Sequence, residues 1–167
     1  MAIKNILVAF NGSDASENAL LVAAQMQKKY AAHVTGLLAH EGQRDTFARR
    51  PWVPENVREI IETAVQSEET RLETRFREVL GAAPQDKVHW ITLAATPDST
   101  VAQYACMYDI TIVGRHMADE SAETSLHPER IAMKAGRPVL VVPPSDLDPS
   151  FIDKPTVLAW DGARAAT

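Results

Sequence analysis

The sequence is poor in cysteine and in aromatic residues, and it has no long apolar run. With Cys106 as its one cysteine among 167 residues, an internal disulfide is excluded. No apolar stretch approaches the length of a membrane-spanning helix, and no basic and apolar leader follows Met1. We therefore expect a cytoplasmic protein in a reducing compartment, with no membrane partner.

Basic residues are too few and too scattered for a nucleic-acid-binding surface. The chain has 17 Lys and Arg against 22 Asp and Glu, which gives a net charge of -5. Proteins that bind nucleic acids usually concentrate positive charge on one face, so we expect no nucleic-acid partner. The hydrophobic fraction of 46% and the charged fraction of 23% are typical of a globular domain with its own core.

Strand-like and helix-like segments alternate along the chain. Short apolar runs predict strands at residues 4–10, 33–39, 88–93, 110–113 and 138–143. Segments with helical spacing of apolar residues separate these runs, and a polar loop covers residues 41–54. Strict alternation predicts an α/β fold, in which a doubly wound parallel sheet of five strands has helices on both faces.

Several helix features can be predicted in more detail. In the first helix, Asp14 is placed to cap the free backbone amides, with Glu17 reaching back. In the third helix, Cys106 falls on the inward side near Ala102, which favours a small buried side chain over a nucleophile. The long helix before Gly81 is expected to place its apolar residues on one side: Val57, Ile60, Ile61, Ala64, Val65, Leu72, Phe76 and Leu80.

The start of the sequence is echoed near its end. Residues 6–12 read ILVAFNG and residues 156–162 read TVLAWDG, each an apolar run closed by a turn. The echo predicts a domain at residues 1–143, a linker at 144–155, and the first strand of a truncated second repeat at 156–167. We expect Trp160 in that strand to dock on the partner subunit of a dimer, because exposure would forgo its burial.

The sheet itself predicts where a ligand would bind. In an open parallel sheet, ligands bind beyond the carboxyl ends of the strands, where the strand order reverses. The loops after the first and fourth strands line that cleft: they are the Asn11-Gly12-Ser13 turn and the segment that begins at Gly114. The turn can also be explained as a helix start alone.

These loops also resemble those of the universal stress protein family. Residues 6–20 are similar to the family's first strand, its Asp-Gly-Ser turn and its Ser-x-x-Ala-Leu helix start. Residues 112–114 and 136–143 look like its fourth strand and last strand. The resemblance spans residues 3–143 and implies a Rossmann-like fold of the adenine nucleotide alpha hydrolase-like type with strand order 3-2-1-4-5. It also implies a twofold homodimer through the last strand, at Val139, Leu140, Val141 and Val142.

The family that this chain resembles includes members that bind ATP or AMP and members that do not. Members of the family that bind ATP or AMP carry Gly-x-x-Gly, nine residues, then Gly-Ser or Gly-Thr after strand four. Here Gly114 matches, but Met117 and the pair Ser125-Leu126 do not, and Asn11 replaces an Asp. We predict weak or no ATP binding and no resident cofactor. The residues that would form the degenerate nucleotide site are Asn11, Gly12, Ser13, Leu38, Ala39, Gly114, Arg115, His116 and Ser125.

Other chemistries have little support in the sequence. The spacing of His116, Glu120, Glu123 and His127 would suit zinc on a helix, but the surrounding residues favour a loop, so we expect no metal site. His33 and His89 fall in strands and are expected to be packed or hydrogen-bonded. No Ser, His and Asp set has triad spacing, so we expect no catalytic residues and no enzyme.

Three functional hypotheses remain. The first is a non-catalytic stress-response protein that acts as a dimer through contacts with an unknown protein partner. The alternative is a domain that holds ATP or AMP, with slow or no hydrolysis. A third hypothesis, a flavodoxin-like or electron-transfer flavoprotein-like carrier, rests on the sheet alone.

Overall fold

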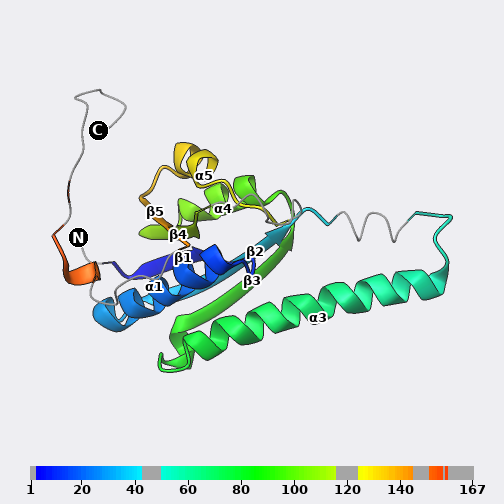
Figure 1. Ribbon diagram of the computed structural model, residues 1–167, viewed down its shortest axis with the longest axis horizontal. Helices are drawn as coiled ribbons and strands as arrows, with labels where there is room; N and C mark the ends of the chain where they lie inside the picture. The colour runs from blue at the N-terminus through cyan, green and yellow to red at the C-terminus, as the bar shows by residue number, and fades with distance from the viewer. Residues whose placement is uncertain (1–2, 43–49, 116–123, 145–150, 156, 158–167) are drawn as a thin grey trace.

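Five parallel strands form one sheet in the order β3-β2-β1-β4-β5 (Figure 1). The computed structural model describes residues 3–42, 50–115, 124–144, 151–155 and 157. The predicted fold class and strand order are confirmed. The strands are β1 (Asn5–Ala9), β2 (His33–His40), β3 (Val88–Ala94), β4 (Ile110–Gly114) and β5 (Val139–Val142).

Helices cover both faces of the sheet. On one face lie α1 (Asp14–Tyr30) and α3 (Glu55–Val79), and on the other lie α4 (Pro97–Ala105) and α5 (Pro128–Ala135) (Figure 1). Two short 3-10 turns, η1 (Gln85–Lys87) and η2 (Phe151–Asp153), complete the described elements. Parallel crossovers of this kind bury the central strands on both sides, which explains why their sequences are continuously apolar.

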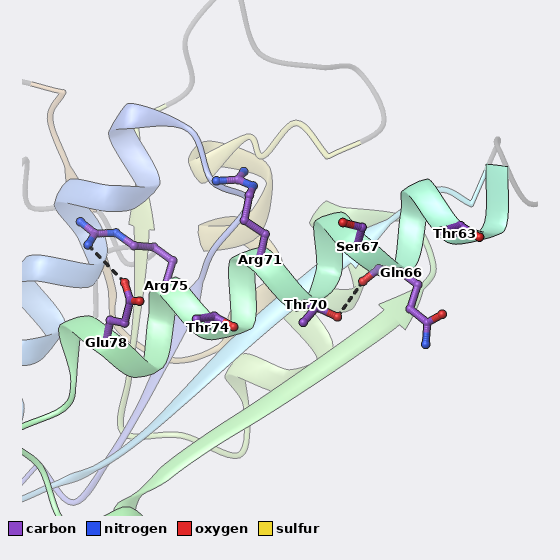
Figure 2. Close-up of a pocket in the computed structure, with 8 residues that line it drawn as sticks. All are labelled: Thr63, Gln66, Ser67, Thr70, Arg71, Thr74, Arg75 and Glu78. Atoms are coloured by element: carbon purple, nitrogen blue, oxygen red, sulfur yellow. Dashed lines mark hydrogen bonds and ion pairs between the residues drawn. The ribbon is translucent and has the colours of Figure 1, made fainter. Parts of the chain in front are cut away.

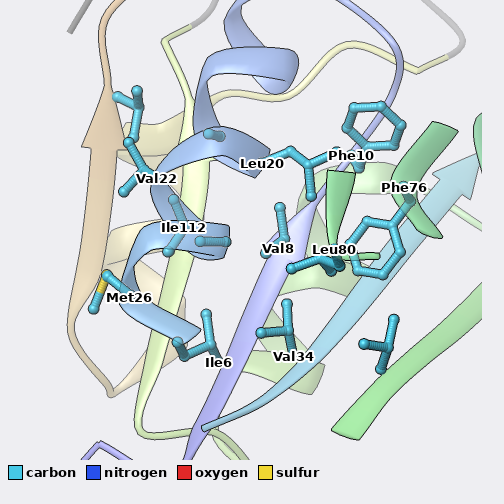
Figure 3. Packing of buried hydrophobic residues seen from close by; sticks show 14 of the residues in the cluster. Ile6, Val8, Phe10, Leu20, Val22, Met26, Val34, Phe76, Leu80 and Ile112 are labelled. Atoms are coloured by element: carbon cyan, nitrogen blue, oxygen red, sulfur yellow. The ribbon is translucent and has the colours of Figure 1, made fainter. Parts of the chain in front are cut away.

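The larger core lies between the sheet and the pair α1 and α3 (Figure 3). Its centre is aromatic: the ring of Phe76 in α3 lies 6.4 Å from that of Phe10 and 5.2 Å from that of Trp90. Phe10 and Phe76 are fully buried. Complete burial of such a side chain contributes about 1.5–3 kcal/mol, so this cluster fixes the C-terminal half of α3 on the sheet.

The N-terminal half of α3 does not pack as its spacing predicted. Figure 1 shows the helix running well past the sheet, and within α3 the buried side chains are Leu72 and Phe76. Ile60 is 66% exposed, and Ala64 is exposed as well. The expectation of one continuous inner face is therefore only partly met over the first three turns. Val57, Ile61 and Val65 are half-buried, whereas Ile60 and Ala64 are exposed where the helix runs past the sheet.

Two local predictions are corrected. The cap of α1 is Ser13, not Asp14: the Ser13 hydroxyl accepts a hydrogen bond from Ser16 N at 3.3 Å. Glu17 turns outward to the guanidinium of Arg75 instead of reaching back. Cys106 is exposed, since α4 ends one residue before it and no longer directs its side chain inward.

A short C-terminal segment is fastened to the end of α1. Phe151 and Ile152 pack against the larger core, and the Lys29 ammonium donates to the carbonyl of Ile152 at 3.0 Å and pairs with Asp153. The expected linker thus includes a docked turn. The proposed second-repeat strand, with Trp160, lies outside the described residues except for the exposed Val157.

None of the described helices combines the length and the apolar character that crossing a membrane requires.

Candidate functional site

The turn after β1 is closed by its own side chains. Asn11 Oδ1 accepts hydrogen bonds from the backbone N of Ser13 at 3.1 Å and from its hydroxyl at 2.7 Å. Asn11 Nδ2 donates to the carbonyl of Thr124 at 3.0 Å, which ties the turn to the segment before α5. Both ends of the Asn11 amide are therefore engaged within the protein. A carboxylate at this position could not make the last of these bonds, because an ionised carboxylate only accepts.

Helix α3 closes over the same turn. Gly12 has φ +80°, and a Cβ atom there would lie 2.5 Å from Leu72 Cδ2 and 3.5 Å from a terminal nitrogen of Arg71. The glycine is needed both for its left-handed backbone and for the closeness of Leu72. Leu72 and Arg71 lie some 60 residues away in sequence, so turn-level reasoning could not identify them as site residues.

The polar face of α3 beside the turn forms a shallow groove of ≈ 640 Å³ that runs from Thr63 to Glu78 (Figure 2). Arg71 is paired with Glu68 at 2.7 Å, which raises the pKa of the Arg71 guanidinium further above its usual range. Arg75 is paired with Glu17 of α1 at 3.1 Å. These pairs are solvent-exposed and stabilise the helix contact only modestly.

Gly114, the residue that matched the nucleotide-binding pattern, serves the packing of α1. A Cβ atom on Gly114 would lie 2.5 Å from the carbonyl oxygen of Ala15 and 2.7 Å from the backbone N of Ser16. The first turn of α1 thus rests directly on the end of β4. The glycine is explained by this close approach and provides no independent support for a phosphate site.

The remaining predicted nucleotide-site residues are only partly brought together. Leu38 and Ala39 are buried in β2, Arg115 is exposed after β4, and Ser125 is half-buried before α5. Leu126, where the nucleotide-binding pattern has Ser or Thr, is buried in the smaller core. His116 lies outside the described residues, as does Met117. The described residues thus do not fit a phosphate cradle of the glycine-rich kind.

Sequence reasoning missed one polar cluster at the start of α4 and α5. Asp98, in the first turn of α4, accepts hydrogen bonds from the backbone N of His127 at 2.8 Å and pairs with His127 Nδ1 at 3.0 Å. Arg130 lies 3.6 Å from the same carboxylate. The cluster holds the start of α5 against the start of α4. In the sequence, His127 was considered only within the zinc spacing that was set aside, and His116, Glu120 and Glu123 of that spacing lie outside the described residues.

Over the residues that the structure describes, no group of three or more His, Cys, Asp and Glu side chains could hold a metal ion.

The fold and the position of the site define a doubly wound α/β protein with its candidate cleft at the switch point between β1 and β4. The model of the universal stress protein family matches residues 2–143, and the chain belongs to that family. A comparison with curated proteins finds no match.

Solved structures of the same fold include nucleotide complexes. A universal stress protein in complex with cAMP is 16% identical, with a TM-score of 0.58 over 87% of this chain and 100% of the other. UspA from Lactobacillus plantarum is 16% identical, with a TM-score of 0.62 over 85% and 99%. A family protein from Arabidopsis thaliana with AMP bound is 11% identical, with a TM-score of 0.59 over 88% and 98%.

Proposed function

We propose that this universal stress protein domain acts without catalysis, as a cytoplasmic homodimer that presents its surface to a protein partner. The observation that carries the proposal is the closed turn after β1. There Asn11 is hydrogen-bonded on both sides and Leu72 lies against Gly12. A turn whose polar side chains already satisfy one another has little to offer a phosphate.

The dimer proposal rests on β5. Within the described part of the chain, β5 pairs with β4 along one edge and with no strand along the other. Val141 on this strand is 44% exposed. An apolar edge strand in a soluble protein needs protection, and pairing with the β5 strand of a second copy would supply it through a twofold axis.

The dimer can be tested by substitution. We expect light scattering to give twice the chain mass for the wild type and the single mass for Val141→Lys. Met133→Lys is the matched control, because Met133 is an 88% exposed apolar residue that lies on α5 and not on the edge strand. A wild type that is monomeric at micromolar concentration would contradict the proposal, and so would dissociation caused equally by both substitutions.

The nucleotide question needs a separate measurement. Titration calorimetry with Mg-ATP and with AMP at physiological salt should show no binding in the low micromolar range, which corresponds to about 8 kcal/mol. Denaturation of the purified protein should likewise release no nucleotide or flavin that mass spectrometry can detect. Stoichiometric nucleotide at either step would replace this proposal by the second one.

The second candidate function is binding of an adenine nucleotide in a remodelled cleft, with slow or no hydrolysis. Its support is that solved structures of the same fold hold cAMP and AMP. In this chain, Arg71 brings a positive charge to the Gly12 turn. If this candidate is right, Arg71→Gln should weaken AMP binding about tenfold or more, while Arg77→Gln, one to two turns further along α3, should not.

A further inference from the structure

Two histidines face one another at the end of the sheet opposite the candidate cleft. His33 begins β2 and His89 lies near the start of the edge strand β3, where it is exposed. His33 Nδ1 and His89 Nε2 are 3.3 Å apart. Together with Asn5, Thr35 and Met107, they line a cavity of ≈ 470 Å³.

The two rings meet edge to edge. Their planes differ by 9° and their centres are 5.6 Å apart. That separation is the N–N distance plus the two ring radii, so both nitrogens lie on the line that joins the ring centres. The lone pair of an imidazole nitrogen points outward in the ring plane along this direction. In the apo protein, the pair is therefore an N–H···N hydrogen bond along a straight line.

We propose that His33 and His89 form a binding site for Cu(I), held linearly between His33 Nδ1 and His89 Nε2. Imidazole is a good ligand for copper, and a monovalent d10 ion accepts two collinear donors. Zinc favours four tetrahedral ligands, and the described residues supply no third His, Cys, Asp or Glu beside the pair. The arrangement of the pair thus favours a metal ion that binds with only two ligands.

Binding requires a tautomer shift and a small movement of the two rings. Each neutral imidazole carries one proton, and one of the two protons lies between the rings in the hydrogen bond. When that proton moves to the outer nitrogen of the same ring, both facing nitrogens become donors to the metal and no net proton is released. The nitrogens must also separate slightly, which the exposed position of His89 on an edge strand allows.

One neighbour suits a soft cation at this position, and a carboxylate lies further away at the same end of the sheet. Met107 lines the same cavity, and a thioether favours Cu(I) over divalent ions. Asp109 accepts hydrogen bonds from the backbone N of Lys4 at 2.8 Å and of Asn5 at 2.9 Å. These two bonds hold the pKa of Asp109 below its usual range, which keeps a negative charge at this end of the sheet.

The test is an anaerobic titration with Cu(I) against bicinchoninate, whose copper complex is coloured. The parent protein carries Cys106→Ser, because the exposed Cys106 thiol would bind Cu(I) by itself. We expect the parent to withdraw one equivalent of copper per chain. His89→Gln and His33→Gln should each lower the affinity on the order of 100-fold, and Met107→Leu by about tenfold or less.

His40→Gln is the matched control. His40 lies at the other end of β2 and pairs with Glu69 at 3.0 Å, so its loss should leave copper binding unchanged. X-ray absorption of the parent should show two nitrogen ligands. If circular dichroism shows that His33→Gln is unfolded, the copper affinity of His89→Gln, a substitution at an exposed position, alone decides whether the pair binds copper.

Three results would overturn the proposal. The first is a parent protein that does not compete with bicinchoninate, and the second is a folded His89→Gln protein that binds as tightly as the parent. The third is Zn(II) binding through the two histidines that is tighter than Cu(I) binding, since this would contradict linear coordination.

Discussion

The two halves of α3 carry apolar residues at the same helical spacing but have different surroundings. In the C-terminal half, Leu72 and Phe76 are buried against the sheet, whereas in the N-terminal half Ile60 lies in solvent. The spacing of apolar residues shows that a helix has an apolar face. It does not show how far along the helix a surface exists to cover that face.

Substitution of Phe76 should have the largest effect. Phe76→Ala would open a cavity among Phe10, Trp90 and Gly36, and we expect a loss of about 3–5 kcal/mol in the free energy of unfolding. Urea denaturation followed by circular dichroism measures this loss. A cost below about 1 kcal/mol would mean that the C-terminal half of α3 is not anchored by this ring.

Leu72→Ala should cost about 2–5 kcal/mol, because Leu72 is buried against the turn after β1. The same substitution sharpens the functional question, since it makes room over Gly12. If Leu72 blocks a nucleotide, AMP should bind the variant more tightly than the wild type in calorimetry. If neither protein binds AMP, the hydrogen-bonded turn at Asn11, and not Leu72, is what prevents binding.

The pair of Arg75 and Glu17 links the C-terminal half of α3 to α1 and should contribute less. A double-mutant cycle with Arg75→Ala and Glu17→Ala should give a coupling energy of about 0.2–1 kcal/mol, because both side chains are partly solvated. The coupling should shrink further in high salt. A salt-independent coupling would show that the pair is shielded from water.

The smallest effect is expected at Ile60. Ile60→Ser should change the free energy of unfolding by within about 0.5 kcal/mol, because the side chain is 66% exposed. The measurement should be repeated at several protein concentrations. A larger loss that grows with concentration would show that a second copy covers this half of the helix.

Much of the fold could be predicted from the sequence, because its signals are local. Apolar runs located the strands, and the alternation of elements required parallel crossovers. The resemblance to the family supplied the order of the strands. One local feature was predicted one residue too late: the cap of α1 is Ser13 and not Asp14, and the Ser13 hydroxyl also donates to the Asn11 side chain.

The site depended on contacts between residues distant in sequence. Leu72 over Gly12, and Asp98 beside His127, are set by the way helices pack, which no spacing in the chain encodes. Gly114 shows the opposite problem: a residue of the right type was present for a different reason, the close approach of α1. A glycine that matches a binding pattern must therefore be checked against its packing before it is assigned to a ligand.

The hydrogen bond between Lys29 and the turn at Phe151–Asp153 determines from which end of the domain a label or a fused protein would extend. Because α1 runs antiparallel to the strands, its last turn lies at their amino ends, away from the Asn11 turn. A fluorophore, a bead or a fused reporter joined beyond Asp153 would begin from that far end. Such a handle would leave the face around Asn11 and Gly114 open for single-molecule or surface-based measurements.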